Sequence, residues 1–390
     1  MTTIVVNAIS VKEGGSLVVL RELLPEMVEM RTEWKWVVVV HSKVKEALPK
    51  LPSIEYRCFP TIDRHAWRVR LWYEIGLPQL LNELGASLLF SHTNYLPRRR
   101  MPCRTLLLVQ HAGHFSPVFR RLTEVQKDPV HRIAWWLKGR WVKSSVCRAD
   151  AVIVQTQTLA HRIVRETGCG SGHVRVIAHG CGQASTQTIP VEPPESDKPW
   201  RVGYITKAGV QKNFALLFEA IKLLKDKGIE LKLVLTLSEG VAENRVILAS
   251  AKKYGIDGVI ENHGEVSPEM IDRLYQTLHI FVFPSLCESF GFPMVEAMAY
   301  GIPLLVADVD SNIEVAGTGG ISFSDHDPDV LAQEIEHLIS DVDWFKLRAQ
   351  ASMARSTNFS WSAAAEHTLS LMDEIMGDKL NSALQYQADS

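Results

Sequence analysis

The sequence predicts an α/β protein made of two Rossmann-like, doubly wound domains that face a ligand cleft. Three observations support this fold class. The chain has 390 residues, which is long for one domain and suits two. Short β-branched runs alternate with helical patterns, as in parallel sheets covered by helices. This alternation occurs twice, and a polar, proline-rich stretch separates the two series.

The first series begins at the apolar run Ile4–Val6, which is typical of a strand buried on both faces. Two glycines, Gly14 and Gly15, follow this run, and a helical pattern begins at Leu17. Further strands are expected at 36–40, 88–90, 105–109 and 151–154. We therefore assign residues 1–185 to the first domain.

The second series follows a stretch that is punctuated by Pro190, Pro193, Pro194 and Pro199. We take 186–199 as the linker and 200–361 as the second domain. A helix is expected over 213–227, and strands at 201–205, 231–235, 259–261, 280–283 and 304–306. The remaining residues, 362–390, are expected to form a helix that packs back on the first domain.

The composition is that of a soluble globular protein, with 46% hydrophobic and 22% charged residues. Six cysteines lie far apart, without the spacing of a zinc site or a redox dithiol, so we expect reduced thiols and no metal site. The N-terminus lacks the pattern of a secretory signal, and no apolar run is long enough to span a membrane. We therefore expect a cytoplasmic protein.

The charge is distributed unevenly. Residues 1–185 hold 26 Lys and Arg against 14 Asp and Glu, which leaves 42 − 26 = 16 basic and 44 − 14 = 30 acidic residues for the rest. The first half is therefore near +12 and the second near −14. A basic half indicates an anionic partner, such as a membrane surface or a lipid-linked diphosphate.

Tryptophans and cations interleave over 130–148, close to the basic run Arg98–Arg100. Such a helix can lie on an anionic membrane. It can equally be a solvated helix whose tryptophans face the core, since Trp135 and Trp136 cannot both point the same way. Nucleic acid is not expected as a partner, because no stacking module or recognition motif accompanies the charge.

The most informative segment runs from Phe283 to Pro303. A strand leads into a turn and then a helix, whose free N-terminal amides can bind phosphate or a sugar hydroxyl. Glu288 and Glu296 are eight residues apart, about two helical turns, so the two are expected to share one face. Glu288 could meet a transferring sugar and Glu296 could accept hydrogen bonds from ribose. The alternative is a plain strand–turn–helix with two solvated glutamates.

This segment resembles the Glu-x7-Glu element of glycosyltransferase family 4, which has the GT-B fold. The matching positions are Pro284, Ser285, Glu288, Phe290, Gly291, Pro293, Glu296, Ala297, Met298, Ala299, Gly301 and Pro303. The family's usual glycine after the first glutamate is Ser289 here. The resemblance implies a retaining enzyme that uses a nucleotide-sugar, with Ser289, Phe290, Gly291 and Phe292 beside the donor.

A second element, from Tyr204 to Asn213, is similar to the family's V-G-R-x4-K-N pattern. Lys207 stands where the family has arginine, and Lys212 and Asn213 match. Two cations at a strand–helix turn can hold a diphosphate leaving group and neutralise its growing charge without a divalent metal. The resemblance thus places Lys207, Lys212 and Asn213 at the donor, with Lys212 and Glu288 also catalytic.

In the first domain, the resemblance places Gly15 near the donor. It makes His111 a catalytic residue that contacts the sugar or a backbone carbonyl of the site and lines the acceptor side. His111 follows a predicted strand, at the edge where α/β proteins bind ligands. His114 is the alternative, and a structural role is open for either histidine.

The resemblance implies a glycosyltransferase that uses a GDP- or UDP-sugar, with mannose as one candidate sugar. Its acceptor would be a glycan or lipid-linked glycan of bacterial surface polysaccharide, of the O-antigen or capsule kind, at the inner face of the cytoplasmic membrane. Two alternatives stay open: a non-catalytic sugar-nucleotide-binding module, and a GT-B enzyme acting on sugar phosphates. A dinucleotide oxidoreductase is disfavoured, because no G-x-G-x-x-G follows a strand.

Overall fold

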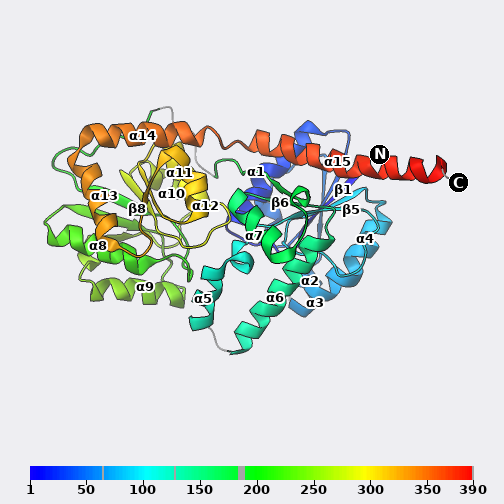
Figure 1. Ribbon diagram of the computed structural model, residues 1–390, viewed down its shortest axis with the longest axis horizontal. Coiled ribbons are helices and arrows are strands. Elements are labelled where there is room, and N and C mark those ends of the chain that lie inside the picture. Colours follow the sequence, from blue (N-terminus) through cyan, green and yellow to red (C-terminus); the bar gives the residue numbers. More distant parts are fainter. Residues whose placement is uncertain (64–65, 127–128, 183–188, 389–390) are drawn as a thin grey trace. The chain divides into compact units, whose positions relative to one another are not determined.

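The computed structural model describes residues 1–63, 66–126, 129–182 and 189–388 (Figure 1). The chain forms two compact units. The first comprises 1–115, 127–180 and 360–390, and the second comprises 116–126 and 181–359. The division at 180/181 falls shortly before the predicted linker, whose first residues, 186–188, lie outside the described residues.

The first unit contains a parallel sheet of seven strands in the order β3-β2-β1-β4-β5-β6-β7. The strands are β1 (Thr3–Ala8), β2 (Lys35–Val40), β3 (Ile54–Cys58), β4 (Leu88–Ser91), β5 (Arg104–Leu108), β6 (Ala151–Val154) and β7 (Val174–Val176). Strand order reverses between β1 and β4. In open α/β sheets, ligands bind beyond the carboxyl ends of the strands at such a reversal.

Helices surround this sheet. They are α1 (Gly15–Met30), α2 (Pro60–Asp63), α3 (Ala66–Leu71), α4 (Leu77–Glu83), α6 (Pro129–Arg148), α7 (Gln157–Thr167) and α15 (Trp361–Ala388), with a short 3₁₀ turn η3 (Ala112–Phe115). The last helix, α15, packs along α1 (Figure 1). Arg31, which follows α1, donates a hydrogen bond to Asp373 of α15 at 2.8 Å. The C-terminal helix therefore belongs to the first unit.

The second unit contains a parallel sheet of six strands in the order β10-β9-β8-β11-β12-β13. The strands are β8 (Trp200–Tyr204), β9 (Leu231–Leu235), β10 (Ile260–Asn262), β11 (Ile280–Phe283), β12 (Leu304–Ala307) and β13 (Gly320–Phe323). Its helices are α5 (Pro117–Gln126), α8 (Phe214–Asp226), α9 (Ala242–Lys253), α10 (Pro268–Tyr275), α11 (Phe292–Ala299), α12 (Asp310–Ala316), α13 (Pro328–Ser340) and α14 (Val342–Ser356). Strand order reverses between β8 and β11.

The predicted α/β class is confirmed, and the expected strands are present. Three further strands, β3, β7 and β13, were not predicted. All three are edge strands, and each is only partly buried. An edge strand needs no continuous apolar run, so its sequence lacks the signal that identifies the central strands.

None of the six cysteines, which all lie within the described residues, forms a disulfide, and Cys103 and Cys287 are buried. Among the described residues, no group of three or more His, Cys, Asp or Glu side chains is arranged to hold a metal ion. Within the described part of the chain, no helix combines the length and apolar character that a membrane crossing requires.

Candidate functional site

The candidate site lies where strand order reverses in the second sheet. β8 and β11 are neighbours there, and both are parallel, so the loops that follow them leave the same edge. The loop after β8 carries Lys207 and Lys212, and the loop after β11 carries Glu288. The topology therefore brings together the two motifs that the sequence singled out.

Lys212 and Glu288 form an ion pair. The Lys212 ammonium donates to Oε1 of Glu288 at 2.7 Å, and their side chains are only 12% and 17% exposed. Ser285 Oγ donates to the same oxygen at 2.6 Å. An ammonium has three N–H donors, and the second carboxylate oxygen accepts no hydrogen bond from the described residues. Both groups therefore keep capacity for a ligand.

Backbone contacts fix the two loops to each other. The Leu286 amide donates to the Gln211 carbonyl at 2.8 Å. The buried Asn312 amide group donates to the Ser285 carbonyl at 2.7 Å, which ties this loop to α12. The positions of Lys212 and Glu288 are therefore set by bonds between residues far apart in the sequence.

The loop after β8 is also anchored at its end. Tyr204 donates to the Lys212 carbonyl at 3.1 Å, and burial, together with the Glu288 charge, raises the pKa of Tyr204 so that its hydroxyl stays protonated. Asn213 precedes α8 in the left-handed conformation (φ 50°) and donates to the Asp325 carbonyl at 2.9 Å. Asn213 is thus a structural element of the turn.

A tight turn opens α11. Gly291 has φ 86°, and a Cβ there would lie 2.5 Å from Met294 Cε, so this position requires glycine. Ser289, Phe290 and Gly291 form the turn, and Phe292 begins the helix. The amino end of a helix carries partial positive charge, which suits an anionic group.

The prediction that Glu288 and Glu296 share one helical face is wrong. α11 begins at Phe292, so Glu288 precedes the helix and helical spacing does not relate the two. Glu296 is within the helix and is only 8% exposed. Its Oε2 accepts a hydrogen bond from Tyr275 at 2.8 Å, and a Cβ on Gly182 would lie 2.0 Å from its Oε1. The carboxylate therefore lies against the backbone at Gly182.

Lys207 is exposed on the loop after β8, in contrast to the partly buried Lys212. In the first unit, Gly15 is the first residue of α1, and the preceding Gly14 has φ 68° and ψ −158°, a conformation that essentially only glycine adopts. The glycine pair therefore makes the tight turn that starts α1.

The two candidate histidines differ in their surroundings. His111 is exposed, and its Nδ1 accepts a hydrogen bond from the Gly113 amide at 3.1 Å. His114 is buried and stacks on Trp135, with ring centroids 4.2 Å apart. Burial lowers the pKa of His114 to about 3, so its ring is neutral at physiological pH. His111 is thus the histidine that a ligand can reach.

The basic aromatic stretch forms α6, and its tryptophans differ in their contacts and exposure. Trp135 stacks on His114, and Trp141 donates to the Leu96 carbonyl at 2.8 Å. Trp136 is 58% exposed. The interpretation in which the tryptophans face the core therefore holds for Trp135 and Trp141 and not for Trp136, which faces outward.

Sequence reasoning did not assign roles to Ser285, Asn312 or Tyr275. Ser285 carried a signal, because it is one of the positions matching the family motif. Asn312 and Tyr275 carried none, since they lie in other helices and reach the site only through the fold. These three side chains orient the loop carbonyl and the two glutamates.

Part of the chain matches a known protein family. Residues 185–355 match the family described as glycosyl transferases group 1. The O-antigen chain mannosyltransferase B of Escherichia coli is 29% identical over 167 residues, which are 43% of this chain and 44% of that protein. The D-inositol 3-phosphate glycosyltransferase of Streptomyces bingchenggensis is 26% identical over 247 residues, 58% of this chain and 53% of that protein. The chain spans about half the length of these two relatives.

Solved structures resemble the whole chain. Sucrose-phosphate synthase from Thermosynechococcus elongatus has a TM-score of 0.77 at 17% identity, covering 97% of this chain and 100% of that one. Anabaena HepE, in complex with UDP and glucose, has a TM-score of 0.69 at 16% identity, covering 96% and 100%. The chain has the GT-B fold, and both sequence relatives are named as glycosyltransferases.

Proposed function

We propose that this protein is a retaining glycosyltransferase of family 4, which moves a sugar from a nucleotide diphosphate sugar to a hydroxyl of a glycan. The observation that carries the proposal is the Lys212–Glu288 pair, held at the strand reversal of the second sheet. A cation and a carboxylate are needed at one place in this reaction, because a diphosphate leaves as the sugar becomes positively charged.

In the proposed reaction, Lys212 binds the diphosphate and neutralises the charge that grows on it as the glycosidic bond breaks. Lys207, on the same loop, adds a second cation, and the amino end of α11 adds partial positive charge. Glu288 faces the sugar and stabilises its positive character. The protein's own cations therefore do the work of a divalent metal in this proposal, which requires none.

Glu296 is proposed to bind the ribose of the donor, and Gly15 to approach its phosphates. The buried position of Glu296 beside Tyr275 supports a precisely held carboxylate. The donor is a GDP- or UDP-sugar. The name of the Escherichia coli relative favours mannose, and the Anabaena structure holds UDP and glucose.

The acceptor is proposed to be a lipid-linked glycan, met on the side of His111 at the inner face of the cytoplasmic membrane, in the assembly of a bacterial surface polysaccharide. The exposed His111 ring supports an acceptor contact. On α6, Ile133, Trp136 and Leu137 are 60%, 58% and 52% exposed, at a spacing that places them on one face. Exposed cations flank them: Arg132, Lys138 and Arg140. An apolar face edged by cations suits an anionic membrane.

A panel of nucleotide-sugars tests the function. Purified protein is incubated with GDP-mannose and with UDP-hexoses, and released nucleoside diphosphate is measured with and without glycan acceptors. Acceptor-dependent release identifies a transferase, and the anomeric configuration of the product, read by NMR, tests retention. Binding of a donor without any release would indicate the non-catalytic module instead. Release only in the presence of a sugar phosphate would indicate a GT-B enzyme that acts on sugar phosphates.

A further inference from the structure

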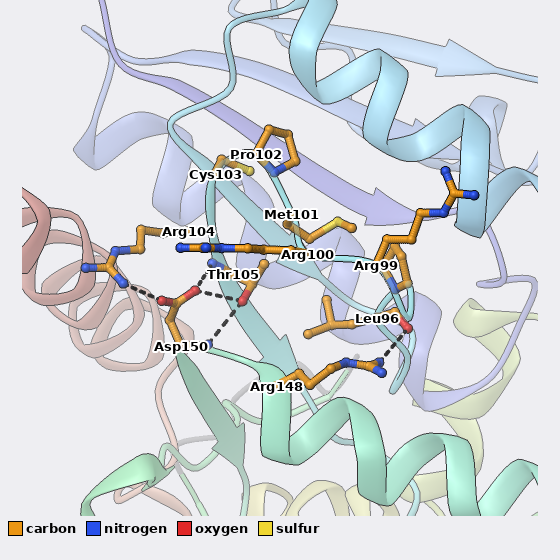
Figure 2. Close-up of a pocket in the computed structure, with 11 residues that line it drawn as sticks. Leu96, Arg99, Arg100, Met101, Pro102, Cys103, Arg104, Thr105, Arg148 and Asp150 are labelled. Atoms are coloured by element: carbon orange, nitrogen blue, oxygen red, sulfur yellow. Dashed lines mark hydrogen bonds and ion pairs between the residues drawn. The ribbon is translucent and has the colours of Figure 1, made fainter.

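A cavity of about 660 Å³ lies in the first unit, whereas Lys212 and Glu288 belong to the second. β5 begins at Arg104 and β6 begins directly after Asp150, and both residues line the cavity (Figure 2). The cavity is therefore at the amino edge of the sheet, whereas His111 follows the carboxyl end of β5. The lining residues are Leu96, Pro97, Arg99, Arg100, Met101, Pro102, Cys103, Arg104, Thr105, Arg148 and Asp150.

This cavity is strongly positive, since four arginines and one aspartate line it and give 4 − 1 = +3. The aspartate already has its partners. Asp150 accepts from Arg104 Nη1 at 2.6 Å, and from the amide and hydroxyl of Thr105 at 2.8 and 2.9 Å (Figure 2). Its charge thus pairs with the guanidinium of Arg104 and with that of no other lining arginine.

Arg99 and Arg100 have no carboxylate partner in the described part of the chain, whereas Arg148 interacts with the Glu74 carboxylate. Arg148 donates only to neutral oxygens, of Ser144 at 3.1 Å and of the Leu96 carbonyl at 3.3 Å. Arg99 and Arg100 make no hydrogen bond or ion pair with any described residue, and in Figure 2 Arg100 extends over the cavity toward Arg104 and Asp150. Burial lowers the pKa of Arg148. Arg99 and Arg100 are exposed to solvent, so an anion that enters the cavity can reach both and supply the opposite charge that they lack.

We propose that this cavity binds a phosphate-bearing ligand, at a site separate from that of the donor. Guanidinium groups bind phosphate oxygens through two parallel hydrogen bonds, so a set of arginines favours phosphate over a simple halide. The volume falls in the range of small-molecule sites and exceeds what one inorganic ion fills. Leu96, Pro97 and Met101 offer apolar surface for the group that carries the phosphate.

Two sources share this chemistry: the phosphate headgroup of a lipid, and a soluble phosphoester such as a sugar phosphate. The proposal concerns binding only, and it stands whether or not the protein transfers a sugar. Its test therefore reads binding at equilibrium, and transfer activity plays no part in it.

Inorganic pyrophosphate is the first probe. The proposed donor site would also attract it, so the parent protein carries Lys207→Ala and Lys212→Ala. Adding Arg99→Gln and Arg100→Gln, which break no hydrogen bond within the described residues, is expected to weaken pyrophosphate binding about tenfold or more by calorimetry. The matched control adds Arg120→Gln and Arg121→Gln, with the same change of charge on exposed residues of α5. An affinity that is unchanged by the cavity substitutions, or that falls equally in the control, overturns the proposal.

Two further probes separate the sources. Vesicles of phosphatidylcholine with phosphatidic acid represent the lipid, with pure phosphatidylcholine as the blank, and glucose 1-phosphate represents the soluble phosphoester. If the Arg99 and Arg100 substitutions weaken binding to the phosphatidic acid vesicles, the cavity is a site for a lipid headgroup. If they weaken binding of glucose 1-phosphate, it is a site for a soluble phosphoester. Substitutions that weaken neither arm contradict the proposal.

Discussion

Lys212 Nζ lies 2.7 Å from Glu288 Oε1, although the two residues are 76 positions apart in the sequence. The carboxylate also accepts from Ser285, and the ammonium lies 5.7 Å from the centroid of the Phe283 ring. A partly buried charge is costly without a partner, so each of the two charges stabilises the other before any ligand arrives. A diphosphate would then meet a cation that is already in place.

Removing this cation is expected to abolish most of the transfer. Lys212→Ala should lower kcat/KM by about 10²- to 10³-fold, because one preorganised charge at a developing anion contributes that much. Lys212→Arg should retain more activity, since it keeps the charge but changes its geometry. Rates are measured at a subsaturating donor concentration. Lys252→Ala, which changes an exposed lysine of α9, is the control. Wild-type transfer by Lys212→Ala would refute the assigned role.

Gly182 is expected to be required for the position of Glu296. A Cβ at residue 182 would lie 2.0 Å from Glu296 Oε1, so Gly182→Ala must displace the carboxylate. If Glu296 binds the ribose, the KM for donor should rise about tenfold or more. Gly258→Ala is the control, because a Cβ there meets nothing within 4 Å. Equal KM values in the two variants would remove Glu296 from the donor site, as would wild-type transfer by Glu296→Ala.

The exposed face of α6 is expected to hold the protein on anionic membranes. Trp136→Ser with Leu137→Ser should reduce co-sedimentation with vesicles containing phosphatidylglycerol, because the apolar contact is lost. Lys143 pairs with Glu166 at 2.6 Å, so it is not a free cation for this surface. Val246→Ser with Leu347→Ser, which changes exposed apolar residues of the second unit, is the control. Unchanged sedimentation of the α6 variant would end the membrane proposal.

Acid is expected to destabilise the first unit through buried histidines. Burial lowers the pKa of His114 to about 3 from an ordinary value of 6.5. Below about pH 6.5 the unfolded chain therefore binds a proton that the folded chain does not, and the free energy of unfolding falls as the pH falls toward 3. Each such histidine lowers the free energy of unfolding by up to about 1.4 kcal/mol for each pH unit of acidification.

His114→Phe keeps the ring against Trp135 and removes one titrating group. Its unfolding midpoint, measured in urea between about pH 7 and pH 5, should fall less steeply with acid than that of the wild type. His161→Phe, on the exposed side of α7, is the control. A slope equal to that of the wild type would show that His114 does not titrate in this way.

The sequence by itself determined the α/β class, the central strands and the identity of Lys212 and Glu288 as candidates. These depend on local patterns: β-branched runs for strands buried on both faces, and a motif of fixed spacing around one turn. The edge strands β3, β7 and β13 lacked such a pattern, because only part of their surface is buried.

Only the tertiary structure decided which side chains meet. It placed Glu288 before α11, turned Trp135 inward and Trp136 outward, and set Gly182 against Glu296. It also gathered the arginines of 99–104 and Arg148 around one cavity. These contacts join residues that are distant in the chain and that meet only in the folded protein. No local pattern of residues therefore encodes them.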